Sequence, residues 1–291
     1  MRAADEAAVA AAGDGRVFIA RAGHAVAEVA RSMMGGAYGR RVVVVAGKGN
    51  NGEDGRVAAA TLESWGASVR VIDAAGAHCE FVDDRVADLV IDAAYGIGFR
   101  GTWAPPIVLD VPVLAVDIPS GLDPATGCVN GGVLVANRTV TFAAPKLGMV
   151  LGDGPSVCGA IDVVDVGIDV DGEIDAFLVE AGDVRRWLPP RDRHAHKWTN
   201  PVRVLAGSDG MNGAASLVSA AAMRSGAGIV HLSSRHGDGS QFPTEIVHRP
   251  LPAEDWAGFV SSDERRFASL VIGPGIGRGD DVALEVREVL A

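Results

Sequence analysis

Two adjacent amides in a glycine-rich segment are the first residues whose types and spacing suit ligand binding. Asn50 and Asn51 lie within residues 46–55, directly after an apolar run at 41–46. Glycines let a phosphate approach the backbone, and the start of a following helix offers free N–H groups. The paired amides add oxygens for a cation and donors for a ligand. Taken alone, the segment is equally consistent with a tight turn in which Asp54 caps a helix.

Two acids and a hydroxyl follow further apolar runs. Asp92 comes after the run at 88–91, where a carboxylate is costly unless a cation or several donors compensate it. Asp117 and Ser120 flank Ile-Pro, and the rigid proline holds an acid and a hydroxyl in one tight turn. Helix capping or an Asx-turn explains each motif when it is taken singly.

The runs that precede these motifs predict the buried strands of a parallel sheet, because short continuous apolar segments are typical of strands covered on both faces. We expect strands at 41–46, 69–72, 88–91, 113–116, 139–142 and 161–164, two helices within 3–34, and a helix over 54–65. This alternation predicts a doubly wound α/β sheet whose ligand site lies beyond the carboxyl ends of the strands.

A second α/β series follows a segment rich in proline and charge at 185–194, and we place a domain boundary there, giving domains 1–182 and 183–291. We expect strands at 202–206, 228–232 and 269–272, and helices at 213–225 and 281–290. The pair His194 and His196 has no third ligand nearby, which favours a solvated linker over a metal site.

Composition narrows the function classes. The net charge of −11 over 291 residues argues against nucleic-acid and anionic-membrane partners, which it would repel. Three cysteines at irregular spacing indicate neither a disulfide framework nor a zinc site, and they fit a reducing cytoplasm. The first residues lack the basic start and apolar stretch of a secretory signal, and no apolar run approaches membrane-spanning length.

Taken together and in order, the segments 50–54, 92–98, 117–123 and 141–148, with the N-terminal helices, resemble the NAD(P)H-hydrate epimerase domain over nearly all of residues 1–170. The resemblance implies a Rossmann-like, three-layer fold. It also implies conversion of the R epimer of hydrated NADH or NADPH (NADHX, NADPHX) into the S epimer, with a bound potassium ion.

The resemblance also assigns roles to single residues. The residues expected to hold the substrate are Asn50, Asn51, Gly52, Glu53, Asp54, Gly96, Ile97, Gly98, Phe99, Arg100, Gly101, Thr102 and Asp117, and those expected to ligate potassium are Asn51, Asp92 and Ser120. Our hypothesis for the general acid and base is Asp117. Glu53 departs from the glycine that the family commonly has, and an inward-turned carboxylate there should weaken dinucleotide binding.

Residues 196–291 resemble the start of the ADP- or ATP-dependent NAD(P)H-hydrate dehydratase, which has a ribokinase-like fold. The resemblance implies that Ala214 and Gly277 contact the S-hydrate. Trp198 stands where the family usually has glycine. The family's later Gly-x-Gly-Asp catalytic turn does not occur, so we expect an incomplete domain that cannot perform the dehydration alone.

Two other readings compete with an epimerase. An epimerase-like domain that has lost catalysis would serve as a scaffold or nucleotide-binding module, but the presence of Asn51, Asp92, Asp117 and Ser120 together favours catalysis. An NAD-dependent oxidoreductase needs a Gly-x-Gly-x-x-Gly turn and an acid about twenty residues on. Asp73 is suitably placed for that acid, but the Asn-Asn pair has no role in hydride transfer. The small-molecule substrate is the partner expected, together with a homo-oligomer.

Overall fold

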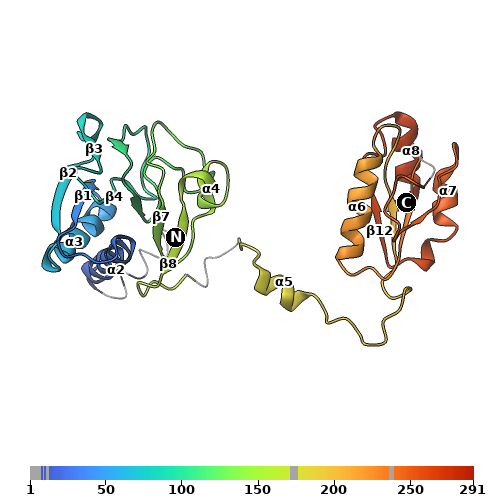
Figure 1. Cartoon of the computed structure of the whole chain (residues 1–291), viewed down its shortest axis with the longest axis horizontal. Coiled ribbons are helices and arrows are strands. Elements are labelled where there is room, and N and C mark those ends of the chain that lie inside the picture. Colours follow the sequence, from blue (N-terminus) through green and yellow to red (C-terminus); the bar gives the residue numbers. More distant parts are fainter. Residues whose placement is uncertain (1–7, 9, 11–12, 171–175, 236–238) are drawn as a thin grey trace. The chain divides into compact units, whose positions relative to one another are not determined.

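The computed structural model describes residues 8, 10, 13–170, 176–235 and 239–291 (Figure 1). Two compact units divide the chain, residues 1–178 and residues 179–291, and each is described by itself. The first of the two helices expected within residues 3–34 falls almost wholly outside the described residues.

A six-stranded sheet forms the centre of the first unit. Its strands are β1 (Arg41–Ala46), β2 (Ser68–Asp73), β4 (Leu89–Ala93), β6 (Val113–Val116), β7 (Arg138–Phe142) and β8 (Ala160–Val164). Every neighbouring pair is parallel, in the order β2-β1-β4-β6-β7-β8. The six predicted strands and the α/β class are confirmed, and the carboxyl ends of the strands meet at one edge of the sheet.

The two long helices that the structure describes in the first unit cover one face of this sheet. α2 (Arg16–Met34) and α3 (Asn50–Ser64) share a core with alternate strand residues such as Val42 and Val44, whereas Val43 and Val45 belong to the core on the other face. The crossings on that other face contain loops, the 3-10 helix η1 (Ala77–Cys79), and the two-stranded parallel sheet of β3 (Phe81–Asp83) and β5 (Ile107–Leu109) rather than long helices. Two short helices follow, η2 (Leu147–Met149) and α4 (Gly154–Val157).

α3 begins four residues earlier than the sequence predicts, at Asn50 instead of Asp54. The preceding Gly49 is extended, with φ −92° and ψ −173°, and serves as the N-cap without a side-chain hydrogen bond. Both asparagines of the glycine-rich segment therefore lie in the first helical turn. A close contact with α2 fixes the helix, because a Cβ on Gly23 would lie 2.5 Å from the Cβ of Val57.

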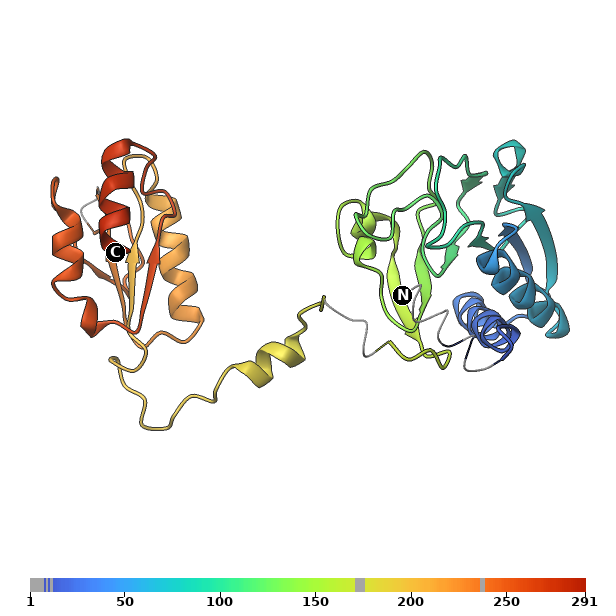
Figure 2. The ribbon, with the colours of Figure 1, turned by 180° about the vertical axis from the view of Figure 1, so that it is seen from behind.

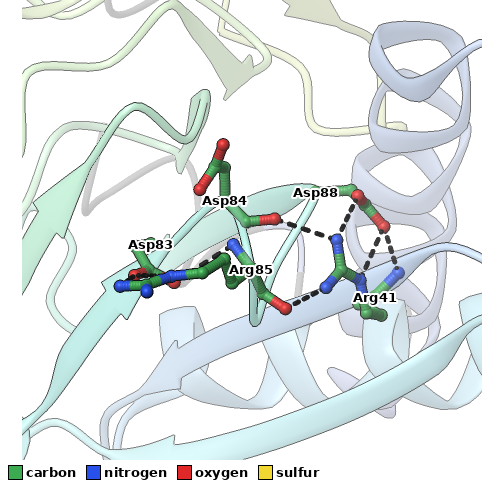
Figure 3. A network of polar contacts seen from close by, with 5 residues as sticks. All are labelled: Arg41, Asp83, Asp84, Arg85 and Asp88. Carbon is green, nitrogen blue, oxygen red and sulfur yellow. Dashed lines mark hydrogen bonds and ion pairs between the residues drawn. The ribbon is translucent and has the colours of Figure 1, made fainter.

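An ionic network joins β1 to the connection between β3 and β4 (Figure 3). Arg41 donates through Nη2 to Oδ1 of Asp88 at 2.8 Å and to the carbonyl oxygen of Asp84 at 3.0 Å. Its guanidinium also hydrogen-bonds the carbonyl oxygen of Arg85. These bonds lie at the amino ends of β1 and β4, away from the predicted ligand motifs, and they lower the pKa of Asp88.

The second unit is a smaller parallel sheet, which Figure 2 displays from behind. Its strands β9 (Val202–Leu205), β10 (Val230–Ser233), β11 (Val247–His248) and β12 (Ser269–Ile272) follow the order β11-β10-β9-β12. The helical segments are α5 (Ala181–Trp187), α6 (Asn212–Arg224), α7 (Trp256–Ser261), η3 (Glu264–Arg266) and α8 (Asp280–Val289). The three predicted strands and two predicted helices are confirmed, while β11, α5 and α7 are too short or too irregular in pattern to be predicted.

Candidate active site

A cavity of about 800 Å³ opens at the carboxyl ends of the central strands in the first unit. Three separate segments contribute predicted site residues to it: Asn50, Asn51 and Asp54 from α3, residues 96–99 from the turn after β4, and Asp117 from the end of β6. The start of α2 and the chain after β8 complete its wall. We call this cavity the strand-end pocket.

Glycines let the backbone segments around this pocket touch. A Cβ on Gly47 would lie 1.9 Å from the carbonyl oxygen of Ala94, and a Cβ on Gly52 would lie 2.0 Å from the carbonyl oxygen of Gly47. Both distances are far below any contact that a real Cβ makes, so only glycine fits. These contacts hold residues 47–52, which we call the asparagine turn, against residues 94–96.

Beneath the pocket lies a buried carboxylate with three donors. Asp92 is fully buried, and it accepts hydrogen bonds from the hydroxyl of Ser120 at 2.6 Å, the backbone N–H of Ser120 at 2.9 Å and the backbone N–H of Ala94 at 3.3 Å. Burial raises the pKa of Asp92 to about 6, and these hydrogen bonds oppose the rise. Ser120 Oγ also accepts the backbone N–H of Tyr95 at 2.8 Å, which ties the cluster to the turn that lines the pocket.

The side chain of Asn51 is buried without a hydrogen-bond partner. Its exposed fraction is 8%, and neither its Oδ1 nor its Nδ2 has a partner within the part of the chain that the structure describes. A Cβ on Gly96 would lie 3.6 Å from Asn51 Oδ1, so the amide stands beside the same turn that contacts Ser120. Because an unpaired buried amide is costly, Asn51 is a candidate for contact with a ligand or an ion.

Asp117 holds an unusual backbone conformation and a buried ion pair. Its φ is +66°, a left-handed value that aspartate tolerates better than most residues. Its carboxylate pairs with the ammonium group of Lys146, which also donates to the hydroxyl of Thr141 at 2.8 Å and the carbonyl oxygen of Phe142 at 3.2 Å. Lys146 is 7% exposed and lines the strand-end pocket.

Sequence reasoning missed Lys146 as a functional residue, although it lies in the motif at 141–148. The signal was available in the sequence: a single lysine follows a proline in a segment of small and apolar residues, where an unpaired charge has no place. Its partner could not be found in this way, because Asp117 lies 29 positions earlier in the chain.

The two carboxyl groups of α3 differ in their surroundings. Asp54 is 7% exposed and lines the pocket, and burial together with the charges of Asp117 and Glu53 raises its pKa to about 8. Glu53 is exposed, pairs with Arg56 at 2.9 Å and does not line the pocket. The carboxylate that departs from the family pattern therefore points to solvent.

The other predicted residues lie outside the strand-end pocket. Arg100, Gly101 and Thr102 line a second hollow of about 360 Å³, and Phe99 lines both. Ala214 and Gly277 belong to the second unit, where a Cβ on Gly275 would lie 3.0 Å from the Cβ of Ala214. The turns after β9 and β12 meet there, since the hydroxyl of Ser208 donates to the carbonyl oxygen of Gly275 at 2.7 Å.

Comparison with known families matches both units. The family described as YjeF-related protein N-terminus matches residues 15–80 and 74–148, and the family described as NAD(P)H-hydrate dehydratase matches residues 202–291. The fold and the families thus define a class of protein in which a parallel α/β unit with a polar strand-end pocket is followed by a second parallel α/β unit.

Individual relatives carry the same combination. The bifunctional NAD(P)H-hydrate repair enzyme Nnr of Moorella thermoacetica is 34% identical over 94% of this chain and 62% of its own length. The corresponding enzymes of Mycobacterium leprae and Escherichia coli are 35% and 31% identical, over 84% and 89% of this chain and 54% and 56% of theirs. The crystal structure of the yeast protein ynu0 covers 61% of this chain and 86% of its own at a TM-score of 0.38 and 17% identity.

The chain thus carries, in order, a match to the family described as YjeF-related protein N-terminus and a match to the family described as NAD(P)H-hydrate dehydratase, and it is similar over most of its length to enzymes named as bifunctional NAD(P)H-hydrate repair enzymes. It spans 54% to 62% of the length of the three relatives named above. Among the described residues, no helix has the length and apolar character needed to cross a membrane.

Proposed function

We propose that the first unit converts the R epimer of NADHX or NADPHX into the S epimer at the strand-end pocket. The observation that carries this proposal is the convergence of Asn51, Asp54 and Asp117 on one cavity from two different strand ends. The family match over residues 15–148 supports the substrate class. The inactive-scaffold alternative gains no support from a pocket that contains this many ionisable groups.

The chemistry of the substrate sets what the pocket must do. Inversion at a hydroxylated ring carbon beside the ring nitrogen requires loss of the hydroxyl, a planar iminium-like cation, and return of water to the other face. Protonation of the departing oxygen and deprotonation of the returning water are the two assisted steps. Asp117, half-buried at the pocket wall, is one of the groups that we propose to take part in this proton exchange.

Asn50 to Asp54 and Gly96 to Thr102 are the proposed binding segments for the dinucleotide. The start of α3 presents backbone N–H groups and the positive end of its dipole, which suits a phosphate. The two hollows share Phe99, so the proposed binding segments are continuous from one to the other.

A potassium ion fits the donor set of Asn51, Asp92 and Ser120. The unpaired amide of Asn51 and the buried carboxylate of Asp92 both gain from a nearby cation. The described residues contain no cluster of three or more histidine, cysteine, aspartate or glutamate side chains, which favours a hard cation held by mixed oxygens over a transition metal. When bound, the ion supplies positive charge beside an anionic substrate in a protein of net charge −11.

For the second unit we propose a part in nucleotide-dependent dehydration of the S-hydrate, with ADP or ATP as the nucleotide. Ala214 and Gly277 are the proposed substrate contacts, and their place beside turns that follow β9 and β12 supports this. A homo-oligomer and a cytoplasmic location remain predictions.

The test is to supply purified R-NADHX and follow the S epimer by chromatography. Because acid also assists loss of the hydroxyl without an enzyme, the assay is run at pH 7.5 or above with a protein-free blank. We expect conversion with potassium, slower conversion with lithium in its place, and about a hundredfold slower conversion by Asp117→Asn. Glu63→Gln, an exposed position on α3, is the control. Binding of NADHX without any conversion contradicts the proposed function and favours the scaffold.

A further inference from the structure

We propose that Asp54 is the acid that protonates the departing hydroxyl, and that Lys146 is a positioning residue that holds Asp117 as the carboxylate. This division rests on the proposed epimerase function and sharpens it. It assigns the two proton transfers to different carboxyl groups and gives a role to a buried lysine for which the family resemblance suggests none.

The ion pair of Asp117 with Lys146 fixes which carboxyl group starts the reaction ionised. The lysine is 7% exposed, and an unpaired ammonium at that depth is costly, so the pair is held together by desolvation as well as by charge. A carboxylate bound in this way has no proton to give. Asp117 is therefore suited to facing the cationic intermediate and to accepting a proton from the returning water.

Lys146 does not qualify as the proton donor, because its ammonium is saturated. An ammonium group has three N–H donors, and the structure gives this one three acceptors: Asp117 Oδ1, Thr141 Oγ1 and the carbonyl oxygen of Phe142. No donor is left over for a substrate oxygen. The lysine thus acts through Asp117 and not on the substrate.

Asp54 has the opposite surroundings. It is 7% exposed, lines the same pocket, and has no hydrogen bond or ion pair to its carboxyl group from any residue that the structure describes. The charged and titratable groups that act on it are Asp117 and Glu53, with Asp14, Arg16 and Lys146 on the wall of the same pocket. Burial raises its pKa to about 8, so it carries a proton at neutral pH.

A pair of carboxyl groups whose environments favour opposite protonation states is the arrangement that separates an acid from a base. In the proposed sequence, Asp54 gives its proton to the hydroxyl oxygen, the C–O bond breaks, and the ring nitrogen lone pair forms a C=N bond as water leaves. Water then adds to that carbon, the C=N pair returns to nitrogen, and Asp117 takes the proton that the water loses. Exchange with solvent returns the proton to Asp54 and removes it from Asp117, so the enzyme is unchanged.

The first test uses kinetics of the full chain with R-NADHX between pH 7.5 and 9.5. In the unmodified chain kcat should fall as pH rises through about 8, because Asp54 loses its proton. Asp54→Asn should lower kcat by about two to four orders of magnitude with KM changed less than about threefold, and should lose this decline with pH. Glu63→Gln is again the control. An Asp54→Asn variant with unchanged kcat and pH profile overturns the acid assignment while leaving the epimerase function intact.

Lys146 is tested by a pair of variants. Lys146→Met should lower kcat about tenfold to a hundredfold with KM changed less than about threefold, and Lys146→Arg, which keeps the charge, should restore part of the lost kcat. A purely structural role would lower kcat equally in both variants, with no restoration by arginine, and this result overturns the positioning role.

A readout that needs no turnover completes the design. Carbon-13 NMR of aspartate-labelled protein, with Asp54 assigned by its absence in Asp54→Asn, should give a titration midpoint for Asp54 near 8 in the free enzyme. A midpoint below about 5 overturns the acid assignment whatever the kinetics show. Complete absence of turnover in the unmodified chain overturns the proposed function and the division together, so the two failures are distinguishable.

Discussion

Replacement of Asp54 by asparagine should stabilise the first unit at the same time as it removes activity. The folded state holds the carboxyl group protonated up to about pH 8, whereas the unfolded chain releases the proton near its ordinary pKa of 3.8. Between these values the folded state binds one more proton than the unfolded state. Stability therefore falls as pH rises through this window, and it would recover only at lower pH.

The size of the effect follows from the shift. The pKa rises from 3.8 to about 8, a difference of about 4 units, and each unit corresponds to about 1.4 kcal/mol. The upper limit of the loss between pH 4 and pH 8 is thus about 6 kcal/mol. Asp54 is only 7% exposed, and because it is half ionised at pH 8 we expect about 5 kcal/mol between these two pH values. Asparagine has nearly the same shape and no charge, so Asp54→Asn should remove this dependence.

Cys158 offers an assay that reports on the first unit alone. It is fully buried, burial raises the pKa of its thiol to about 11, and all three cysteines of the chain lie in this unit. Pulsed labelling of Cys158 with 4,4′-dithiodipyridine, a disulfide that also reacts with thiols in acid, across a urea series and read by mass spectrometry gives the free energy of unfolding at each pH. The variant and the unmodified chain are compared at the same pH, so the reactivity of the thiol itself cancels.

The advantage of Asp54→Asn should grow from near zero at pH 4 to about 5 kcal/mol at pH 8. Glu63→Gln, which changes an exposed carboxyl group on the same helix, should show no such growth. An advantage of the same size at pH 5 and pH 8 refutes the reasoning, because it would mean that Asp54 is ionised in the folded state at neutral pH.

Three further predictions concern contacts within the first unit and use the same labelling assay. Gly47→Ala should lower the free energy of unfolding by about 1 to 3 kcal/mol, because the new methyl group meets the carbonyl oxygen of Ala94 at 1.9 Å. The same substitution should weaken binding of S-NADHX in equilibrium dialysis, and unchanged binding would contradict the proposed loop contact. Asp88→Asn should lower the free energy of unfolding by about 1 kcal/mol at pH 7 and leave it unchanged at pH 2. The reason is that Arg41 lowers the pKa of Asp88, so the stabilisation is lost as pH falls below the ordinary pKa of an aspartate. An equal loss at both pH values would exclude the ion pair as its source. Leu62→Ala, at a fully buried position of α3, should cost about 2 to 5 kcal/mol, and a cost below about 1 kcal/mol would contradict its place in the core.

The strands of both sheets are predictable because their signal is local. Each is a short, nearly continuous apolar run, and the structure explains the pattern: Val42 and Val44 pack on one face of β1 while Val43 and Val45 pack on the other. The gathering of polar motifs at one edge follows from the parallel order, since carboxyl ends of parallel strands meet there. The contact between Asp92 and Ser120, 28 positions apart, is of this kind.

The features of the site that the sequence does not predict depend on strand register and on burial. Lys146 reaches Asp117 only because β7 lies beside β6, and nothing in the separate segments indicates how far the lysine extends. From the sequence, Asp54 is predicted to cap the helix. The structure shows that α3 begins at Asn50, so Asp54 lies one turn inside the helix and is buried. Short pieces such as β3 and β5 fall below the length at which periodicity is informative.

The glycine contacts make one side of the strand-end pocket stiff. Residues 47, 52 and 94 are in backbone-to-backbone contact, so the asparagine turn and the turn after β4 shift only as a single body. The start of α2, on another part of the pocket wall, is tied to the chain before it by the N–H of Arg16, which donates to Oδ1 of Asp14 at 2.9 Å. We therefore expect the proposed binding groups on the two turns to keep their spacing when a ligand enters the strand-end pocket.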